Sequence, residues 1–123
     1  MYITELSMDE RIEKAFAVAN YMATLSNQRR IVLEEFNQKL VYYSNGGTFV
    51  IDPTLINFTR MVLDLGYTHD VPFVDVNNFP VVIADVQTFF DTILLTYMQS
   101  LNEYSVKFAD IKSKRKIGDI VEL

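Results

Sequence analysis

The sequence has no cysteine, one histidine, four glycines and three prolines among its 123 residues. The lack of cysteine excludes disulfides, cysteine nucleophiles and thiolate metal sites such as zinc fingers. His69 is the only histidine, so no second one is present to complete a histidine metal site. Four glycines do not supply a Walker loop or a dinucleotide fingerprint. We therefore expect a non-enzymatic protein that uses no cofactor and no metal.

Long apolar runs and a basic leader are also missing. No stretch approaches the roughly 20 apolar residues that span a bilayer, and the first seven residues carry an acid where a secretory signal carries Lys or Arg. The formal charge of −5, from 11 basic and 16 acidic side chains, opposes nonspecific attraction to duplex DNA. The sequence predicts a soluble protein that is not secreted and has no membrane partner.

Half of the residues are apolar and 22% are charged, which is typical of a globular domain that favours helices. We expect a mainly α fold with two long helices, one short helix and a small β-hairpin. The chain should form a single domain over residues 1–123. Its expected parts are a long heptad helix over 7–44, a short strand, short helix and hairpin over 48–83, and a long amphipathic helix over 85–116.

The first predicted helix has clear start and stop signals. Ser7 and Glu10 have the spacing of a capping box, and the segment Asn45–Gly47 can adopt the positive φ angles that end a helix. Between them, apolar and aromatic residues alternate spacings of four and three, as in a heptad seam. The seam consists of Met8, Ile12, Ala15, Ala19, Met22, Ser26, Arg29, Leu33, Phe36, Leu40 and Tyr43.

The polar stretch Ser26–Arg30 leaves two interpretations open. Ser26 or Asn27 could cap a second helix and fold the segment into an antiparallel hairpin. The preserved register favours instead one helix of about 55 Å, at 1.5 Å per residue. A helix that long cannot bury its whole stripe in one small domain, so it implies a homo-oligomer. The interface residues that we expect are Met22, Leu33, Phe36, Leu40 and Tyr43.

The acidic residues and the histidine have structural explanations. Asp52 and Asp85 stand where helix N-caps belong, and Asp75 lies beside the Asn77-Asn78 turn expected at the tip of the hairpin. His69 and its neighbour Asp70 point to opposite sides in an extended loop, so they form no acid–base pair. The sequence therefore predicts no catalytic residue.

The strongest charge feature is a basic cluster at the end of the last predicted helix. It places four cations in five residues: Lys112, Lys114, Arg115 and Lys116. One interpretation is an anion contact, with nucleic acid or with an acidic protein surface. The other, which Asp119 and Glu122 favour by diluting the patch, is that the cations stabilise the helix C-terminus by opposing its dipole.

Residues 48–117 resemble a family of small proteins of large, T-even-like contractile-tailed bacteriophages. The resemblance rests on strand, turn and helix patterns and covers a little over half of the chain. These patterns are Thr48–Asp52 before a helix ended by Leu65-Gly66, the block Asp70–Val81, the segment Leu101–Tyr104 and the basic Lys112–Lys116. The resemblance implies an accessory or virion-assembly protein that acts through protein contacts, in the cytoplasm of an infected host cell or in the virion.

The sequence thus predicts a non-enzymatic protein–protein interaction module, with a phage virion-structural or assembly role. Its expected partners are further copies of itself and another phage or host protein. The alternative is a small phage factor that associates with nucleic acid or modifies transcription and uses the Lys112–Lys116 cluster. Steep loss of binding with salt would distinguish the alternative, because phosphate contacts release counterions whereas an apolar interface does not.

Overall fold

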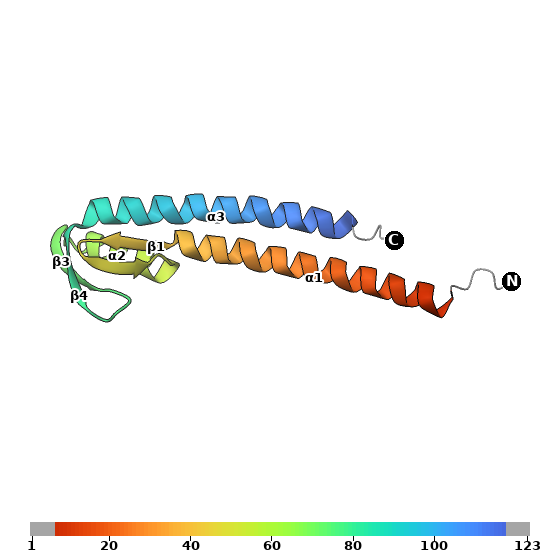
Figure 1. Cartoon of the computed structure of the whole chain (residues 1–123). Helices are drawn as coiled ribbons and strands as arrows, with labels where there is room; N and C mark the ends of the chain where they lie inside the picture. Colours follow the sequence, from red (N-terminus) through yellow and green to blue (C-terminus); the bar gives the residue numbers. More distant parts are fainter. Residues whose placement is uncertain (1–6, 118–123) are drawn as a thin grey trace. The chain divides into compact units, whose positions relative to one another are not determined.

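The computed structural model describes residues 7–117 and has a mainly α fold with minor β, as the sequence predicts (Figure 1). Over these described residues, three helices combine with two antiparallel hairpins of two strands each. The elements in chain order are α1 (Met8–Lys39), β1 (Val41–Ser44), β2 (Gly47–Val50), α2 (Pro53–Asp64), β3 (His69–Val74), β4 (Pro80–Asp85) and α3 (Val86–Ile117).

The chain divides into two compact units. Unit 1 takes residues 1–33 and 105–123, of which the structure describes 7–33 and 105–117. Unit 2 takes Glu34–Tyr104 and contains both hairpins, helix α2 and the adjoining parts of the two long helices.

Helix α1 begins as the capping pattern predicts, with the backbone N–H of Glu10 donating to Ser7 Oγ at 3.1 Å. It continues through the polar stretch Ser26–Arg30 without a break, so the continuous helix favoured by the heptad register is confirmed. No glycine or proline interrupts this segment, which leaves every backbone N–H after the first turn free to continue the helical ladder.

The predicted end of this helix at residue 44 is wrong, because α1 ends at Lys39 and Val41–Ser44 is strand β1. Asn45 and Gly46 have φ angles of 52° and 84° and form the two-residue turn of a hairpin instead of a helix cap. An Asn-Gly pair after a β-branched and aromatic run is a strong hairpin signal. The heptad spacing of Leu40 and Tyr43 obscured it.

Asp75 joins the two hairpins. Its buried carboxylate accepts backbone N–H bonds from Asn77 and Phe79 in its own loop, at 2.9 and 3.0 Å, and from Thr48 of β2 at 3.2 Å. The N–H of Val76 then donates to the carbonyl of Thr48 at 2.9 Å. These bonds hold the pKa of Asp75 below its usual range, because the charged carboxylate is the better acceptor, with the Phe79 N–H contributing most.

A close approach of backbone to side chain also joins the hairpins. A Cβ at Gly47 would come within 2.6 Å of Val81 Cγ2 on β4, so only glycine fits at this position without a shift. Asn45 Oδ1 accepts the N–H of Ala84 at 3.3 Å. The turn and first residue of β2 therefore fix the second hairpin against the first.

The core of unit 2 lies between the hairpins, α2 and the first half of α3. Phe89 is its centre, with ring centroids 5.2 Å from Phe49 and 5.4 Å from Phe73. The buried cluster consists of Leu40, Phe49, Ile51, Val62, Phe73, Val81, Ile83, Val86, Phe89 and Ile93. Strands β2, β3 and β4 and helices α2 and α3 each contribute to it, or the residue that follows them does, and Phe36 of α1 and Tyr42 of β1 pack against it as partly buried side chains.

Replacing Asp52 with alanine should destabilise unit 2 by about 1 kcal/mol. Asp52 is the N-cap of α2, and its Oδ1 accepts the N–H of Leu55 at 2.7 Å. Chemical denaturation followed by circular dichroism measures the change, and Asp52→Ser should restore most of the stability because serine also caps helices. Equal stability of wild type and the alanine variant would contradict the assigned cap.

Replacing Asp75 with asparagine should weaken unit 2 at neutral pH and reduce its loss of stability in acid. The lowered pKa of Asp75 means that its carboxylate stabilises the folded state fully above about pH 4 and loses this effect as pH falls through the folded-state pKa. An asparagine amide would present a donor to one of the three N–H groups. Urea melts between pH 2.5 and 7 measure both effects.

The matched control is Asp64→Asn, because Asp64 forms only an exposed ion pair with Arg60. This variant should keep the wild-type pH profile. An Asp75→Asn profile parallel to that of wild type would show that the carboxylate is not the link between the hairpins.

Candidate functional site

Within unit 1, one face of helix α1 packs against the part of α3 that contains Phe108 and Ile111, which line shared hollows with Leu25 and Val32. Leu25 is the only buried residue of α1, at 3% exposure, and half-buried Tyr21, Gln28 and Val32 lie on the same face at spacings of four and three. Opposite them, Ile111 of α3 is buried at 5% exposure. This contact face determines which side of α1 is used inside the chain.

The heptad seam of α1 lies on a different side. At 100° per residue, its members from Met8 to Leu33 lie between about 40° and 140° around the axis from Leu25. The large apolar ones stay open, with exposed fractions of 69% for Met8 and 44%, 44% and 43% for Ile12, Met22 and Leu33. We call the exposed members of this stripe the exposed seam. They are Met8, Ile12, Ala15, Ala19, Met22, Ser26 and Leu33.

The length of the two helices explains why so much of α1 stays open. In unit 1, α1 contributes about 39 Å of helix and α3 about 20 Å, at 1.5 Å per residue. Residues 8–24 accordingly include no buried side chain, and Phe16 is also exposed at 65%. A contiguous apolar strip of this kind is typical of a protein–protein interface.

The structure separates the five predicted interface residues. Met22 and Leu33 belong to the exposed seam of unit 1, whereas Phe36 and Leu40 pack within unit 2. The Phe36 ring stacks on Tyr104 with centroids 4.9 Å apart, and Leu40 is 5% exposed in the core. Tyr43 lies on strand β1 and is 75% exposed. The five residues therefore do not form one surface, because the helix ends before the last two of them.

Sequence analysis missed the face of α1 that packs inside the chain. Tyr21, Leu25 and Val32 recur at spacings of four and seven, which is itself the pattern of an amphipathic helix. This second stripe is readable in the sequence beside the heptad seam. A helix with two apolar stripes indicates two packing partners rather than one.

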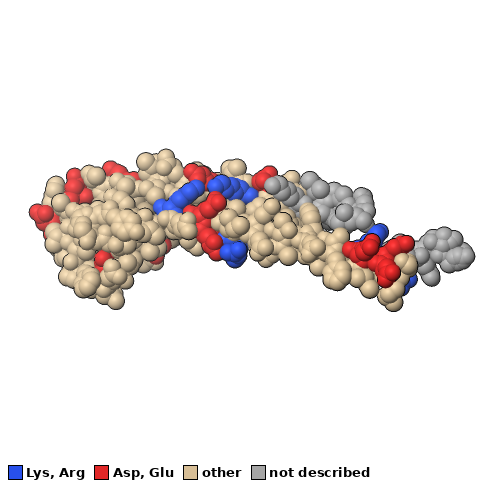
Figure 2. All heavy atoms as spheres, viewed as in Figure 1, with Lys and Arg blue, Asp and Glu red and all other residues tan. Residues whose placement is uncertain are grey.

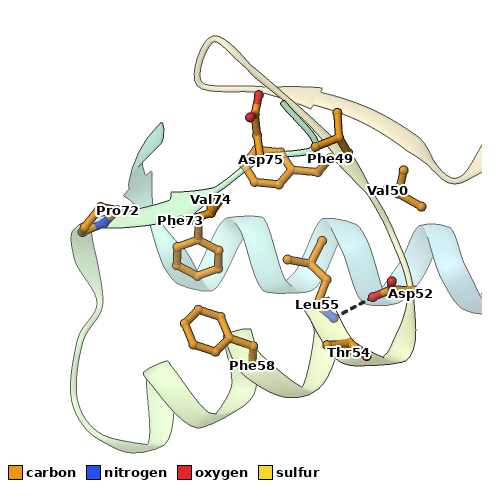
Figure 3. Close-up of a pocket in the computed structure, with 11 residues that line it drawn as sticks. Phe49, Val50, Asp52, Thr54, Leu55, Phe58, Pro72, Phe73, Val74 and Asp75 are labelled. Carbon is orange, nitrogen blue, oxygen red and sulfur yellow. Dashed lines mark hydrogen bonds between the residues drawn. The ribbon is translucent and has the colours of Figure 1, made fainter. Parts of the chain in front are cut away.

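Unit 2 carries a groove of about 400 Å³ between α2 and the strands β2 and β3 (Figure 3). Phe58 and Phe73 point toward one another in it and meet edge to face, with centroids 5.2 Å apart. Val50 and Val74 stand exposed at its rim. Its lining is predominantly apolar, so its chemistry fits an apolar side chain of a partner.

The basic cluster lies in the last turns of α3, which ends at Ile117. Lys112 is exposed and lines a hollow of about 250 Å³ in unit 1 with Leu25, Arg29, Phe108 and Ile111. The side chains of Lys114, Arg115 and Lys116 lie outside the described residues. The anion contact therefore stays a prediction.

Asp85 and His69, at the ends of the second hairpin, each have a local hydrogen-bond partner. Asp85 caps α3 by accepting the N–H of Thr88 at 3.0 Å, and this bond, with a smaller contribution from His69, lowers the pKa of Asp85. His69 Nδ1 lies 2.9 Å from Thr68 Oγ1. Over residues 7–117 no three His, Cys, Asp or Glu side chains gather as a metal site, and no helix there is long and apolar enough to cross a membrane.

A scan against protein-family models, a search of curated proteins and a search of solved structures each gave no significant match to this chain.

Proposed function

We propose that the protein is a non-enzymatic protein–protein interaction module that self-associates through the exposed seam of α1. The observation that carries the proposal is that α1 has two apolar faces and uses only one of them inside unit 1. Leu25 is buried against α3, whereas Met22 and Leu33 are exposed on the other face.

The energetics fit an association that depends on concentration. The four large seam residues are Met8, Ile12, Met22 and Leu33, each about half exposed or more. Burying the exposed half of such a side chain is worth about 1 kcal/mol, and two copies supply eight of them. The gross gain of roughly 8 kcal/mol is comparable with the cost of association, which is about 4–15 kcal/mol.

Unit 2 presents the surface that meets a different protein. Its second hairpin exposes Val74, Phe79 and Val82, at 66%, 64% and 54%, beside the groove of Figure 3. A phage or host protein with an apolar contact segment is the partner that we propose for this surface. The resemblance to phage proteins supports an accessory, virion-structural or assembly role.

The replacement of Met22 and Leu33 by glutamate should abolish self-association, because it places four charges in an apolar interface of two copies. Sedimentation equilibrium between about 1 and 200 μM measures the mass, a range chosen to bracket the affinity of a marginal interface. We expect the wild type to shift to a dimer or larger oligomer with concentration and the variant to stay a monomer.

The matched control is Asn20→Glu with Asn27→Glu, which adds the same charges on a third, polar side of α1. This variant should associate like the wild type. A wild type that remains a monomer throughout, or a control that dissociates like the seam variant, would overturn the proposed function.

Binding to duplex DNA tests the alternative function. With a net charge of −5, the protein should bind a 30-base-pair duplex weakly at physiological salt. Fluorescence anisotropy across a salt series measures the binding. Tight binding whose affinity falls steeply with salt, and is lost when Lys112, Lys114, Arg115 and Lys116 are changed to glutamine, would favour the nucleic-acid function instead.

A further inference from the structure

We propose that two copies of this chain pair with their α1 helices antiparallel, about a two-fold axis between residues 20 and 21. This inference rests on the proposed self-association and defines its partner and register. Each Ile12 then lies opposite Arg29 of the partner subunit, and each Leu33 lies opposite Met8 of the partner subunit. The argument comes from the order of large, small and charged residues along the heptad seam from Met8 to Leu33, which is the exposed seam together with half-buried Arg29.

A parallel pair would place identical seam residues against one another, because both helices then share one register. Arg29 would face Arg29 of the partner subunit, and two cations in a largely apolar interface repel each other and lose hydration. Ala15 and Ala19 would also face their own copies. That arrangement leaves thin layers in the middle of the seam and a repulsive layer near its end.

In an antiparallel pair, each a position of the heptad lies opposite a d position of the partner helix. The layers are Ile12 with Arg29, Ala19 with Met22, Ser26 with Ala15 and Leu33 with Met8. The two layers at the axis each combine Ala19 with Met22, so only two thin layers, both of Ala15 with Ser26, remain where a parallel pair would have three, at residues 15, 19 and 26. The arginine stem packs on isoleucine while its guanidinium reaches water or an acid.

The two ends of the seam differ in the sign of their net charge, which favours the antiparallel direction. Residues 8–14 hold three acids, Asp9, Glu10 and Glu13, and two cations, Arg11 and Lys14, for a net charge of −1, and Figure 2 shows acidic and basic side chains together at the beginning of the helix. Residues 26–33, at the other end, hold Arg29 and Arg30 and no acid, for a net charge of +2, and Glu34 and Glu35 follow at the start of unit 2. Antiparallel pairing brings the net-negative end of each helix to the net-positive end of the partner helix, which is a modest attraction, whereas parallel pairing brings ends of like net charge together.

This register gives every residue of the exposed seam a partner on the other helix. The layer of Leu33 and Met8 is the last one at both ends, because the next seam residues, Phe36 and Leu40, are packed in the core of unit 2. Seven of the eight seam positions between residues 8 and 33 are exposed in one copy, and Arg29 is half-buried. The paired helices therefore bury the strip that unit 1 leaves open, without drawing on residues that unit 2 needs.

Cysteine cross-linking tests the direction, and the chain offers a clean background because it has no cysteine. Ala15→Cys and Ser26→Cys are small exposed substitutions that leave Arg29 in place. In the antiparallel pair residue 15 lies beside residue 26 of the other copy. Two copies of residue 15 are then about 16 Å apart along the axis, at 1.5 Å per residue.

Each variant is treated with a short bismaleimide alone and in an equimolar mixture, after sedimentation has shown that both self-associate like wild type. We expect a cross-linked dimer in the mixture, and peptide mass spectrometry should identify residues 15 and 26 as the linked positions. Neither variant alone should give a cross-linked dimer above background. Cross-linking of Ala15→Cys to itself would overturn the antiparallel direction while leaving self-association intact. Dimers without the 15–26 cross-link would overturn the register, and a monomeric wild type would overturn the proposed function itself.

Discussion

The burial of Leu25 against the end of α3 is the contact on which the surface of this protein depends. That contact assigns one side of α1 to the interior of unit 1. It thereby determines which way the remaining apolar residues of the helix face. The heptad seam then falls about a quarter turn away, where α3 cannot cover it. A helix that needed only its own chain would carry one apolar stripe.

Unit 2 is built differently, around short strands that have little stability of their own. Isolated two-stranded hairpins are marginal in water, so each must be held by contacts outside its own ladder. Here the Asp75 carboxylate and the close approach of Gly47 to Val81 link the hairpins, and the Phe89 ring packs beneath both. The result is a compact unit that keeps apolar side chains of its second hairpin exposed.

Much of the fold could be predicted from the sequence, because its signals are local. The capping pattern at Ser7, the N-caps Asp52 and Asp85 and the turn beside Asp75 each depend on residues within five positions. The first hairpin was missed because two local rules conflicted at Leu40–Tyr43, where heptad spacing indicated helix and the following Asn-Gly indicated a hairpin. The structure follows the turn signal, since Asn45 and Gly46 take positive φ angles and Val41 pairs with Val50.

The candidate surface could be predicted only in part, since it depends on which of two stripes the chain covers itself. The seam spacing was visible, and Met22 and Leu33 are on the exposed seam. Nothing local to the sequence shows that Leu25, rather than Met22, packs against α3. That choice comes from long-range packing, which the spacing of apolar residues along one helix does not determine.

Hydrogen exchange of the α1 backbone at several protein concentrations tests the central claim most directly. Residues 8–24 have no buried side chain in one copy, and a helix of that length is marginal alone. If a second copy covers the seam, amide protection of these residues should rise steeply with protein concentration, while protection of the unit 2 core stays constant. Weak protection of residues 8–24 that does not change with concentration would contradict the account.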